Sequence, residues 1–147
     1  LAPSRDLGLP RRPAEWTERT AEQQAEVEEE SFRAWVDGVH ERFAPSHLSP
    51  FEHNLEVWRQ LWRVVERSDV VLLVADIRNP ALHIPPALYD HVIEQGKKVV
   101  VVLSKVDLVD QAHVDAWCKW ISTRFSAARV AFFSSKGRAI GGSVGGG

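Results

Sequence analysis

Charged and hydroxyl-bearing side chains gather in three short segments, each of which directly follows an apolar run of the chain. These segments are Asp76-Ile77-Arg78-Asn79-Pro80, Ser104-Lys105-Val106-Asp107 and Ser134-Ser135-Lys136-Gly137. They supply carboxylates that accept hydrogen bonds, ammonium groups that donate them and hydroxyls that do both. If the apolar runs are parallel strands, all three segments lie beyond the carboxyl ends of those strands, where ligands bind in open α/β sheets. For each segment taken alone, the alternative is a turn that caps the next helix.

The second and third segments together resemble the guanine-reading motifs of GTP-binding proteins, Asn-Lys-x-Asp and Ser-Ala-Lys. The resemblance implies that Asp107 accepts hydrogen bonds from the adjacent ring N–H and exocyclic amine of guanine, a pair of donors that adenine lacks. Lys105 and Lys136 would lay their apolar stems across the two faces of the ring. The backbone N–H of Ser135 would donate to the guanine carbonyl oxygen. The residues assigned to guanine binding are Ser104, Lys105, Asp107, Ser134, Ser135 and Lys136.

Ser104 departs from the first motif, which usually has Asn at this position. That Asn ties neighbouring loops together and assists base recognition, whereas a hydroxyl is shorter and has fewer hydrogen-bonding groups. We therefore expect the chain to bind guanine more weakly than the full motif would.

The order of the segments resembles a more specific family. In ordinary GTPases a phosphate loop, Gly-x-x-x-x-Gly-Lys-Ser/Thr, comes before the base-reading loops, but no such motif precedes Ser104. The chain instead resembles a circularly permuted GTPase, in which the base-reading motifs come first, and within that family it resembles the guanine nucleotide-binding protein-like subgroup. The resemblance covers about residues 51–137. It is carried by residues 58–64, 68–72, 76–80, 85–89 and 104–108.

The first polar segment has the most distinctive local pattern, Asp-x-Arg-x-Pro. Asp76 and Arg78 carry opposite charges two residues apart, so one interpretation is an ion-paired turn. The other interpretation places both residues in a loop of the nucleotide site. The sequence leaves the two open.

The resemblance implies binding of GTP or GDP, GTP hydrolysis with Mg²⁺, and a role in ribosome biogenesis on a pre-ribosomal particle, through rRNA or a ribosomal protein. Hydrolysis requires backbone N–H groups, a Lys and a Ser/Thr-bound Mg²⁺ around the phosphates, and the sequence has no such motif. We therefore expect the guanine-recognition half of a GTPase, inactive alone, with Mg²⁺ bound only in a complete protein. The alternative is a catalytically inactive, GTPase-like protein-interaction module.

The glycines near the end of the sequence invite comparison with a phosphate loop. Gly142 and Gly147 have the spacing of the two phosphate-loop glycines. However, residues 138–140 do not have the character of a buried strand, from which a phosphate loop should leave. We interpret residues 138–147 as a flexible Gly-rich linker.

Composition narrows the function classes. The 147 residues carry 18 Lys plus Arg and 20 Asp plus Glu, and the formal net charge of -2 argues against a large nucleic-acid footprint. The longest apolar runs, Val70–Ala75 and Val99–Leu103, are far shorter than the roughly 20 residues of a membrane-spanning helix.

Cys118 is the single cysteine, so it is interpreted as a packed thiol, and the histidines show no metal-ligand spacing. We expect no membrane or metal partner and an intracellular location, cytoplasmic or nuclear to nucleolar. The absence of Met at position 1 suggests a part of a longer chain.

The elements before the polar segments are predicted to be helical. After an irregular lead-in over residues 1–14, we expect helices over Thr17–Phe43 and Phe51–Arg67, separated by a break at residues 44–50. Trp58 and Trp62 lie one turn apart, which favours core packing over a nucleic-acid stacking platform. The acidic first half of the first helix is interpreted as a solvated face, with an acidic partner-binding tail as the alternative; its acidic residues are Glu22, Glu26, Glu28, Glu29 and Glu30.

From Asp69 onward the pattern predicts strand, helix, strand, helix, strand. The first strand, from Val70, is expected to be buried on both faces because its apolar residues are continuous. A helix follows from Pro85 and Pro86 to a stop at Gly96; the later strands are Lys98–Leu103 and Val130–Phe133, with a helix capped by Asp110 between them.

We therefore predict an α/β fold with a three-layer, P-loop-NTPase-like parallel sheet, as a partial, circularly permuted G domain with an N-terminal helical extension. The predicted domains are a largely helical extension at residues 1–50, the amino-terminal half of the G domain at 51–137 and the linker at 138–147. With only three strands, one lateral edge of the sheet and part of its apolar face should lack partners.

Overall fold

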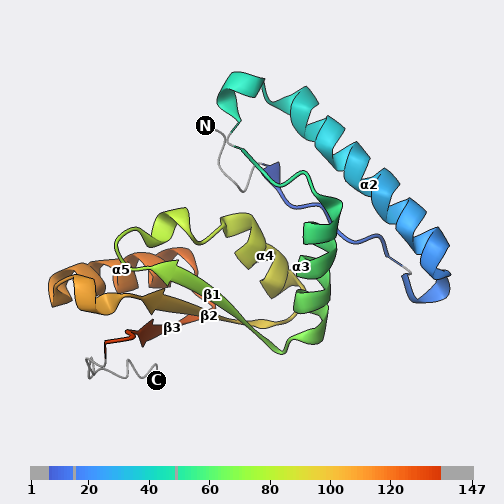
Figure 1. Cartoon of the computed structure of the whole chain (residues 1–147). Coiled ribbons are helices and arrows are strands. Elements are labelled where there is room, and N and C mark those ends of the chain that lie inside the picture. Colours follow the sequence, from blue (N-terminus) through green and yellow to red (C-terminus); the bar gives the residue numbers. More distant parts are fainter. Residues whose placement is uncertain (1–6, 15, 49, 137–147) are drawn as a thin grey trace. The chain divides into compact units, whose positions relative to one another are not determined.

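The computed structural model describes residues 7–14, 16–48 and 50–136, and the chain divides into two compact units (Figure 1). The helical unit comprises Leu1–Ser68 with Pro86–His91, and the sheet unit comprises Asp69–Pro85 with Val92–Gly147. Residues 1–6 of the predicted lead-in and the predicted linker at 138–147 lie outside the described residues. The domain boundaries and the three-layer arrangement stay predictions.

Two long helices dominate the helical unit: α2 at Ala21–Arg42 and α3 at Leu55–Arg67. Short 3-10 helices lie at Trp16–Glu18 (η1) and Pro45–His47 (η2). Both α-helices begin four residues later than the sequence pattern suggests, because polar side chains cap them. Thr20 forms a capping box with Gln23, in which each side chain accepts a hydrogen bond from the other residue's backbone N–H. Asn54 accepts the N–H of Glu56 at 3.0 Å.

The apolar faces of these two helices supply the core of the helical unit. Phe32 and Val39 of α2 are buried, as are Trp62 and Val65 of α3. The indole N–H of Trp62 donates to the backbone oxygen of Pro10 at 2.9 Å, so the lead-in is fastened to α3. The predicted core role of Trp62 is confirmed.

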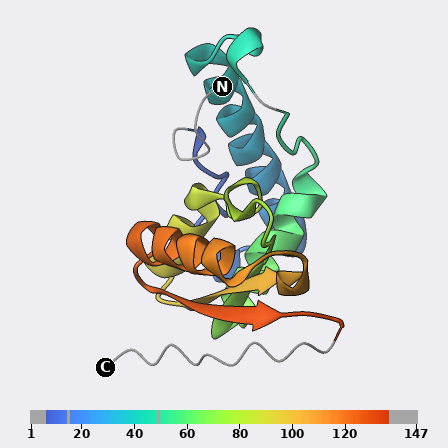
Figure 2. The ribbon, with the colours of Figure 1, turned by 90° about the vertical axis from the view of Figure 1, so that its left-hand side faces the viewer.

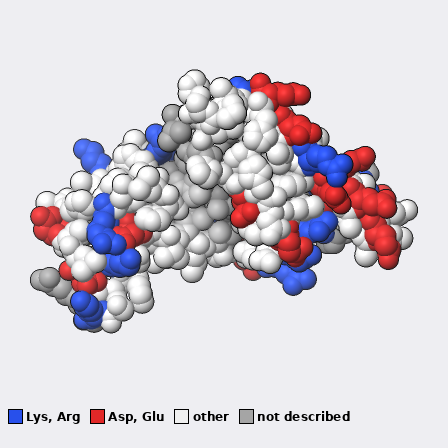
Figure 3. Space-filling view, turned by 45° about the horizontal axis from the view of Figure 1, so that its top comes forward, with Lys and Arg blue, Asp and Glu red and all other residues white. Residues whose placement is uncertain are grey.

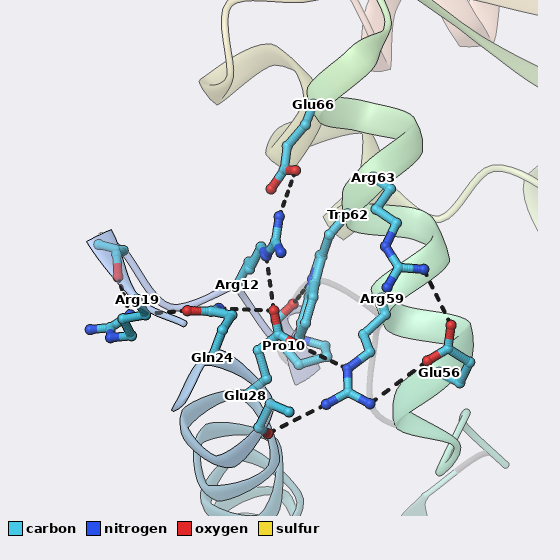
Figure 4. Close-up of polar contacts among 12 residues, drawn as sticks. Pro10, Arg12, Arg19, Gln24, Glu28, Glu56, Arg59, Trp62, Arg63 and Glu66 are labelled. Carbon is cyan, nitrogen blue, oxygen red and sulfur yellow. Dashed lines mark hydrogen bonds and ion pairs between the residues drawn. The ribbon is translucent and has the colours of Figure 1, made fainter. Parts of the chain in front are cut away.

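Glu28 corrects the interpretation of the acidic first half of α2. Acidic side chains gather along the surface of this helix (Figure 3), but Glu28 is only 4% exposed. Its carboxylate accepts hydrogen bonds from Arg12 at 2.9 Å, Arg59 at 2.8 Å and Gln24 at 2.8 Å (Figure 4). A buried carboxylate needs such partners, and the sequence pattern did not reveal that Arg12 and Arg59 would supply them.

The sheet unit contains three parallel strands in the order β1-β2-β3. They are β1 at Val70–Asp76, β2 at Lys98–Ser104 and β3 at Ala128–Phe133. The predicted parallel direction of the three strands is confirmed, and β3 begins two residues earlier than predicted. In this arrangement β1 and β3 are the edges of the described sheet.

The two faces of the sheet differ in exposure. Side chains alternate along each strand, so one face carries buried residues; those of β1 and β2 are Val71, Leu73, Ala75, Val99, Val101 and Leu103. On the other face, Val70, Leu72 and Val74 are 45%, 59% and 61% exposed. The prediction that β1 is buried on both faces is therefore wrong, since the side chains on this face are about half exposed. The prediction that part of the apolar face lacks partners is confirmed.

The helix α5, Gln111–Arg124, packs beside β3 on the buried side of the sheet (Figure 2). Asp110 caps it by accepting the N–H of His113 at 2.8 Å, as predicted. Val114 and Ile121 of the helix are buried, as is Phe125, which follows its last residue. The remaining elements are α4 at Pro86–Glu94 and the 3-10 helices η3 at Pro80–Leu82 and η4 at Val106–Leu108. In the described part of the chain, no helix has the length and hydropathy to span a membrane.

Candidate functional site

The parallel register brings the carboxyl ends of the three strands to one edge of the sheet. Asp76, the last residue of β1, is the register partner of Ser104, the last residue of β2. Ser104 in turn pairs with Phe133 at the end of β3. The three polar segments therefore leave the sheet side by side, as the topology argument expects. Gly137, the last residue of the third segment, lies outside the described residues.

Asp76 links the first two segments through ion pairs. Its Oδ2 accepts a hydrogen bond from Lys105 Nζ at 2.8 Å and one from Arg78 Nη2 at 2.6 Å. Its Oδ1 accepts hydrogen bonds from Arg78 Nε and from the Arg78 backbone N–H, both at 3.0 Å. Asp76 and Arg78 thus form the ion-paired turn that one interpretation of the sequence proposed, and Lys105 joins it from the next segment.

The hydrogen bonds of Asp76 also set its charge state. The Arg78 guanidinium, followed by the Lys105 ammonium, holds the pKa of Asp76 far below its ordinary value of 3.8. The carboxylate is therefore ionised throughout the neutral range, and Arg78 in return has a raised pKa because of Asp76.

Ser104 fastens the ends of two strands together. Its hydroxyl donates to the backbone oxygen of Ala75 at 2.9 Å, and its own backbone oxygen accepts the N–H of Ile77 at 3.0 Å. The side chain thus makes a tie between neighbouring segments, which is one of the two roles that Asn has in the motif. Its effect on guanine affinity stays a prediction.

Asp107 and Ser134 bring the second and third segments together. The Ser134 hydroxyl donates to Oδ1 of Asp107 at 2.7 Å and accepts the backbone N–H of Lys136 at 3.2 Å. The hydrogen bond from Ser134 lowers the pKa of Asp107, and the nearby charge of Lys136 lowers it further. An ionised carboxylate has about four acceptor positions, so the bond from Ser134 leaves Asp107 able to accept from a ligand.

The structure thus places the predicted site residues at one edge of the sheet, and hydrogen bonds join most of them into two groups. Asp76, Arg78 and Lys105 form one group, and Asp107 and Ser134, with the backbone of Lys136, form the other. Ser135 lies exposed in the turn between Ser134 and Lys136. The guanine-binding role assigned to each residue stays a prediction.

The pairing of Asp76 with Lys105 was missed by sequence reasoning, although one signal pointed toward it. The adjacent parallel strands β1 and β2 have seven residues each and end at Asp76 and Ser104. Lys105, which follows Ser104, therefore leaves the sheet next to the Asp76 carboxylate. An acid ending one such strand and a base following the next are candidates for an ion pair.

The described residues contain neither a metal-binding cluster nor an activated cysteine. Among the described residues, no group of three or more His, Cys, Asp or Glu side chains could hold a metal ion. Cys118 is half-buried on α5, and its burial, with a smaller contribution from Asp115, raises the pKa of the thiol. A raised thiol pKa lowers the fraction of reactive thiolate at neutral pH.

Comparison with known proteins gives a consistent set of relatives. The chain is 46% identical over 134 residues to guanine nucleotide-binding protein-like 1 from Homo sapiens and from Macaca fascicularis, a match that includes 90% of the chain. It is 37% identical over 134 residues to the large subunit GTPase 1 homolog of Drosophila melanogaster, a match over 88% of the chain. No family model matches the chain.

The chain spans 22% of the length of each of these relatives. The relatives' names agree with the resemblance carried by the polar segments and the tryptophan-bearing helix. Over the 134 aligned residues, the chain is therefore similar to one segment of the guanine nucleotide-binding protein-like proteins.

Proposed function

We propose that the carboxyl edge of the sheet binds the base of GTP or GDP, and that the chain is the guanine-recognition half of a circularly permuted GTPase. The observation that carries this proposal is the 2.7 Å hydrogen bond between Ser134 and Asp107, which joins the two segments that resemble guanine-reading motifs. The relatives named as guanine nucleotide-binding proteins support it.

Asp107 selects the base in this proposal. Its lowered pKa keeps the carboxylate ionised at neutral pH, so it accepts and does not donate hydrogen bonds. Guanine offers two adjacent N–H donors to such an acceptor, and adenine does not. Lys105 lies in the same segment as Asp107, and Lys136 lies in the neighbouring segment. Each lysine covers one face of the ring with its aliphatic stem.

The phosphates and Mg²⁺ are assigned to other parts of a longer protein. Of the two carboxylates at this edge, Asp76 is already paired with two cations, and Asp107 is the one proposed to accept from the base. They do not fit a Mg²⁺ site, and no metal-binding group lies elsewhere among the described residues. Our proposal that the whole protein hydrolyses GTP therefore rests on the names of its relatives and not on the described residues.

The biological setting is also a proposal. The Drosophila melanogaster relative is named for a large subunit. We propose that the protein acts in ribosome biogenesis on a pre-ribosomal particle, through rRNA or a ribosomal protein, in the cytoplasm or the nucleus and nucleolus.

A second candidate function follows from the exposed face of the sheet. Val70, Leu72 and Val74 present an apolar row to solvent, and Phe133 of β3 is 57% exposed. Exposed apolar surface of this kind marks interaction sites, so a catalytically inactive, GTPase-like interaction module is the alternative. Saturable and base-selective nucleotide binding counts against that alternative.

The test uses Asp107→Asn and nucleoside monophosphates, which are soluble enough to measure weak binding. In amide NMR titrations of the chain, we expect GMP to bind more tightly than AMP. Asp107→Asn should weaken GMP binding and strengthen XMP binding, because the amide can donate to the oxygen that replaces the amine of guanine. Asp69→Asn, at the opposite end of β1, is the control and should behave as the wild type. Unchanged GMP binding in Asp107→Asn would remove this residue from the base site.

A further inference from the structure

Lys105 has an unusual backbone conformation. Its φ is +60°, and it is the one non-glycine residue with positive φ in the described part of the chain. Residues that have a Cβ rarely adopt this left-handed backbone conformation, because it costs free energy. The conformation determines where the side chain leaves the backbone, but the four rotatable bonds of a lysine leave its ammonium free to sample many positions.

In the structure, that ammonium forms an ion pair with Asp76. Lys105 is 55% exposed, yet its Nζ lies 2.8 Å from Oδ2 of Asp76. The side chain of Asp76 is itself only 12% exposed. A carboxylate at the end of a strand is a much less mobile partner than water for an ammonium on a flexible stem.

Arg78 orients the Asp76 carboxylate that Lys105 contacts. Three hydrogen bonds from Arg78, two from the guanidinium and one from the backbone, engage both oxygens of Asp76. The fork geometry of arginine matches a carboxylate and sets its orientation. The order of contacts is therefore Arg78 to Asp76 to Lys105, and it runs from the first polar segment to the second.

We propose that Asp76 is a positioning residue that holds Lys105 beside the base site, and that it sets the affinity for the purine ring without choosing among purines. This inference rests on the proposed function, since it takes Lys105 to cover a face of the base. Contact between an aliphatic stem and a ring face does not depend on the groups at the ring edge. The edge is the part that Asp107 recognises, so the two carboxylates have separable effects.

The separation predicts two different mutational signatures. Asp76→Asn keeps the size of the side chain and removes the charge that pairs with Lys105. It should weaken GMP and IMP by the same factor, roughly two- to fivefold for the loss of a partly exposed ion pair. Since IMP lacks the exocyclic amine, a change in the ratio of GMP to IMP affinity reports edge recognition, and Asp107→Asn should change it.

The experiment combines these affinities with a direct measurement on the lysine. In the nucleotide-free chain, ¹⁵N relaxation of the lysine ammonium groups gives an order parameter for Lys105, with Lys98 at the other end of β2 as the internal reference. We expect the order parameter of Lys105 to exceed that of Lys98 in the wild type and in Asp69→Asn, and to fall to the Lys98 value in Asp76→Asn.

The outcomes separate the inference from the function on which it rests. If the wild-type chain shows no saturable GMP binding, the proposed function fails and this role of Asp76 fails with it. If GMP binds but the Lys105 order parameter is unchanged in Asp76→Asn, or the GMP to IMP ratio shifts in that variant, the positioning role alone is overturned. Equal loss of GMP and IMP affinity together with a mobile Lys105 supports it.

Discussion

Glu28 of α2 offers a sharp test of how the helical unit is held together. Its side chain is 5% exposed and lies between Arg12 of the lead-in and Arg59 of α3. Burial by itself would raise the pKa of Glu28, but the hydrogen bonds from Gln24, Arg59 and Arg12 bring it below the ordinary value of 4.5. The carboxylate is therefore ionised at neutral pH and joins three segments through charge-assisted hydrogen bonds.

The perturbation is Glu28→Gln, which keeps the shape of the side chain and removes its charge. The amide oxygen can still accept from one arginine, but the amide nitrogen cannot accept from the other. A hydrogen bond to a charged group contributes about 1.5–3 kcal/mol. Because Arg12 and Arg59 are 18% and 23% exposed and can recover some hydration, we expect a loss of about 2 kcal/mol in the free energy of unfolding.

The assay is urea unfolding at pH 7 followed by circular dichroism, with hydrogen exchange of α2 amides to localise the effect. With a slope of about 2 kcal/mol per molar urea, the midpoint of the helical unit should fall by about 1 M. The control is Glu29→Gln, one residue along, where the carboxylate is 64% exposed and pairs with Arg33 on the same helix. Its loss should be below about 0.5 kcal/mol.

The comparison of the two variants can refute the reasoning. If Glu28→Gln is no more destabilising than Glu29→Gln, the buried carboxylate does not hold the lead-in and α3 to α2. Faster exchange in α2 of the first variant and not of the second would localise the interaction as described.

Two further predictions concern stability. Because the folded-state pKa of Glu28 lies below its unfolded value, the unfolded chain binds more protons in the acidic range. The stabilisation from the Glu28 carboxylate is complete above about pH 5 and is lost as the pH falls through the folded-state pKa. The difference in urea midpoint between wild type and Glu28→Gln should therefore shrink as the pH is lowered through the acidic range, and a difference that does not change with pH would contradict this. Leu73 is 7% exposed, so Leu73→Ala should lower the free energy of unfolding by about 2–5 kcal/mol. Leu72, on the other face of β1, is 59% exposed, so Leu72→Ala should lower it by less than about 1 kcal/mol in the same urea assay. Equal losses would mean that both faces of the strand are covered.

Local chemistry allowed the elements themselves to be predicted from the sequence. Asp110 caps α5 as its residue type suggests, and Gly96, with φ +70°, follows the end of α4. The apolar runs became the expected parallel strands, and their carboxyl ends brought the polar segments to one edge. Such features depend on neighbouring residues and on the right-handed connection of parallel strands.

Burial was harder to predict because it depends on what covers each face. The continuous apolar run of β1 is compatible with burial on either or both faces, and in the described structure Leu73 is buried while Leu72 is exposed. Glu28 illustrates the converse: its neighbours in sequence are acidic and exposed, but arginines 16 positions before it and 31 after it make a buried site for its charge.

The sequence by itself determined which residues resemble base-reading motifs, because the types and spacing of Ser104, Lys105, Asp107 and Lys136 are properties of the chain alone. Only the tertiary structure decided which of the charged and hydroxyl groups touch one another. Asp76 lies 29 positions from Lys105, and Ser134 lies 27 positions from Asp107. Hydrogen bonds of this kind require donor and acceptor within about 3 Å, a condition that strand register satisfies and that no local pattern encodes.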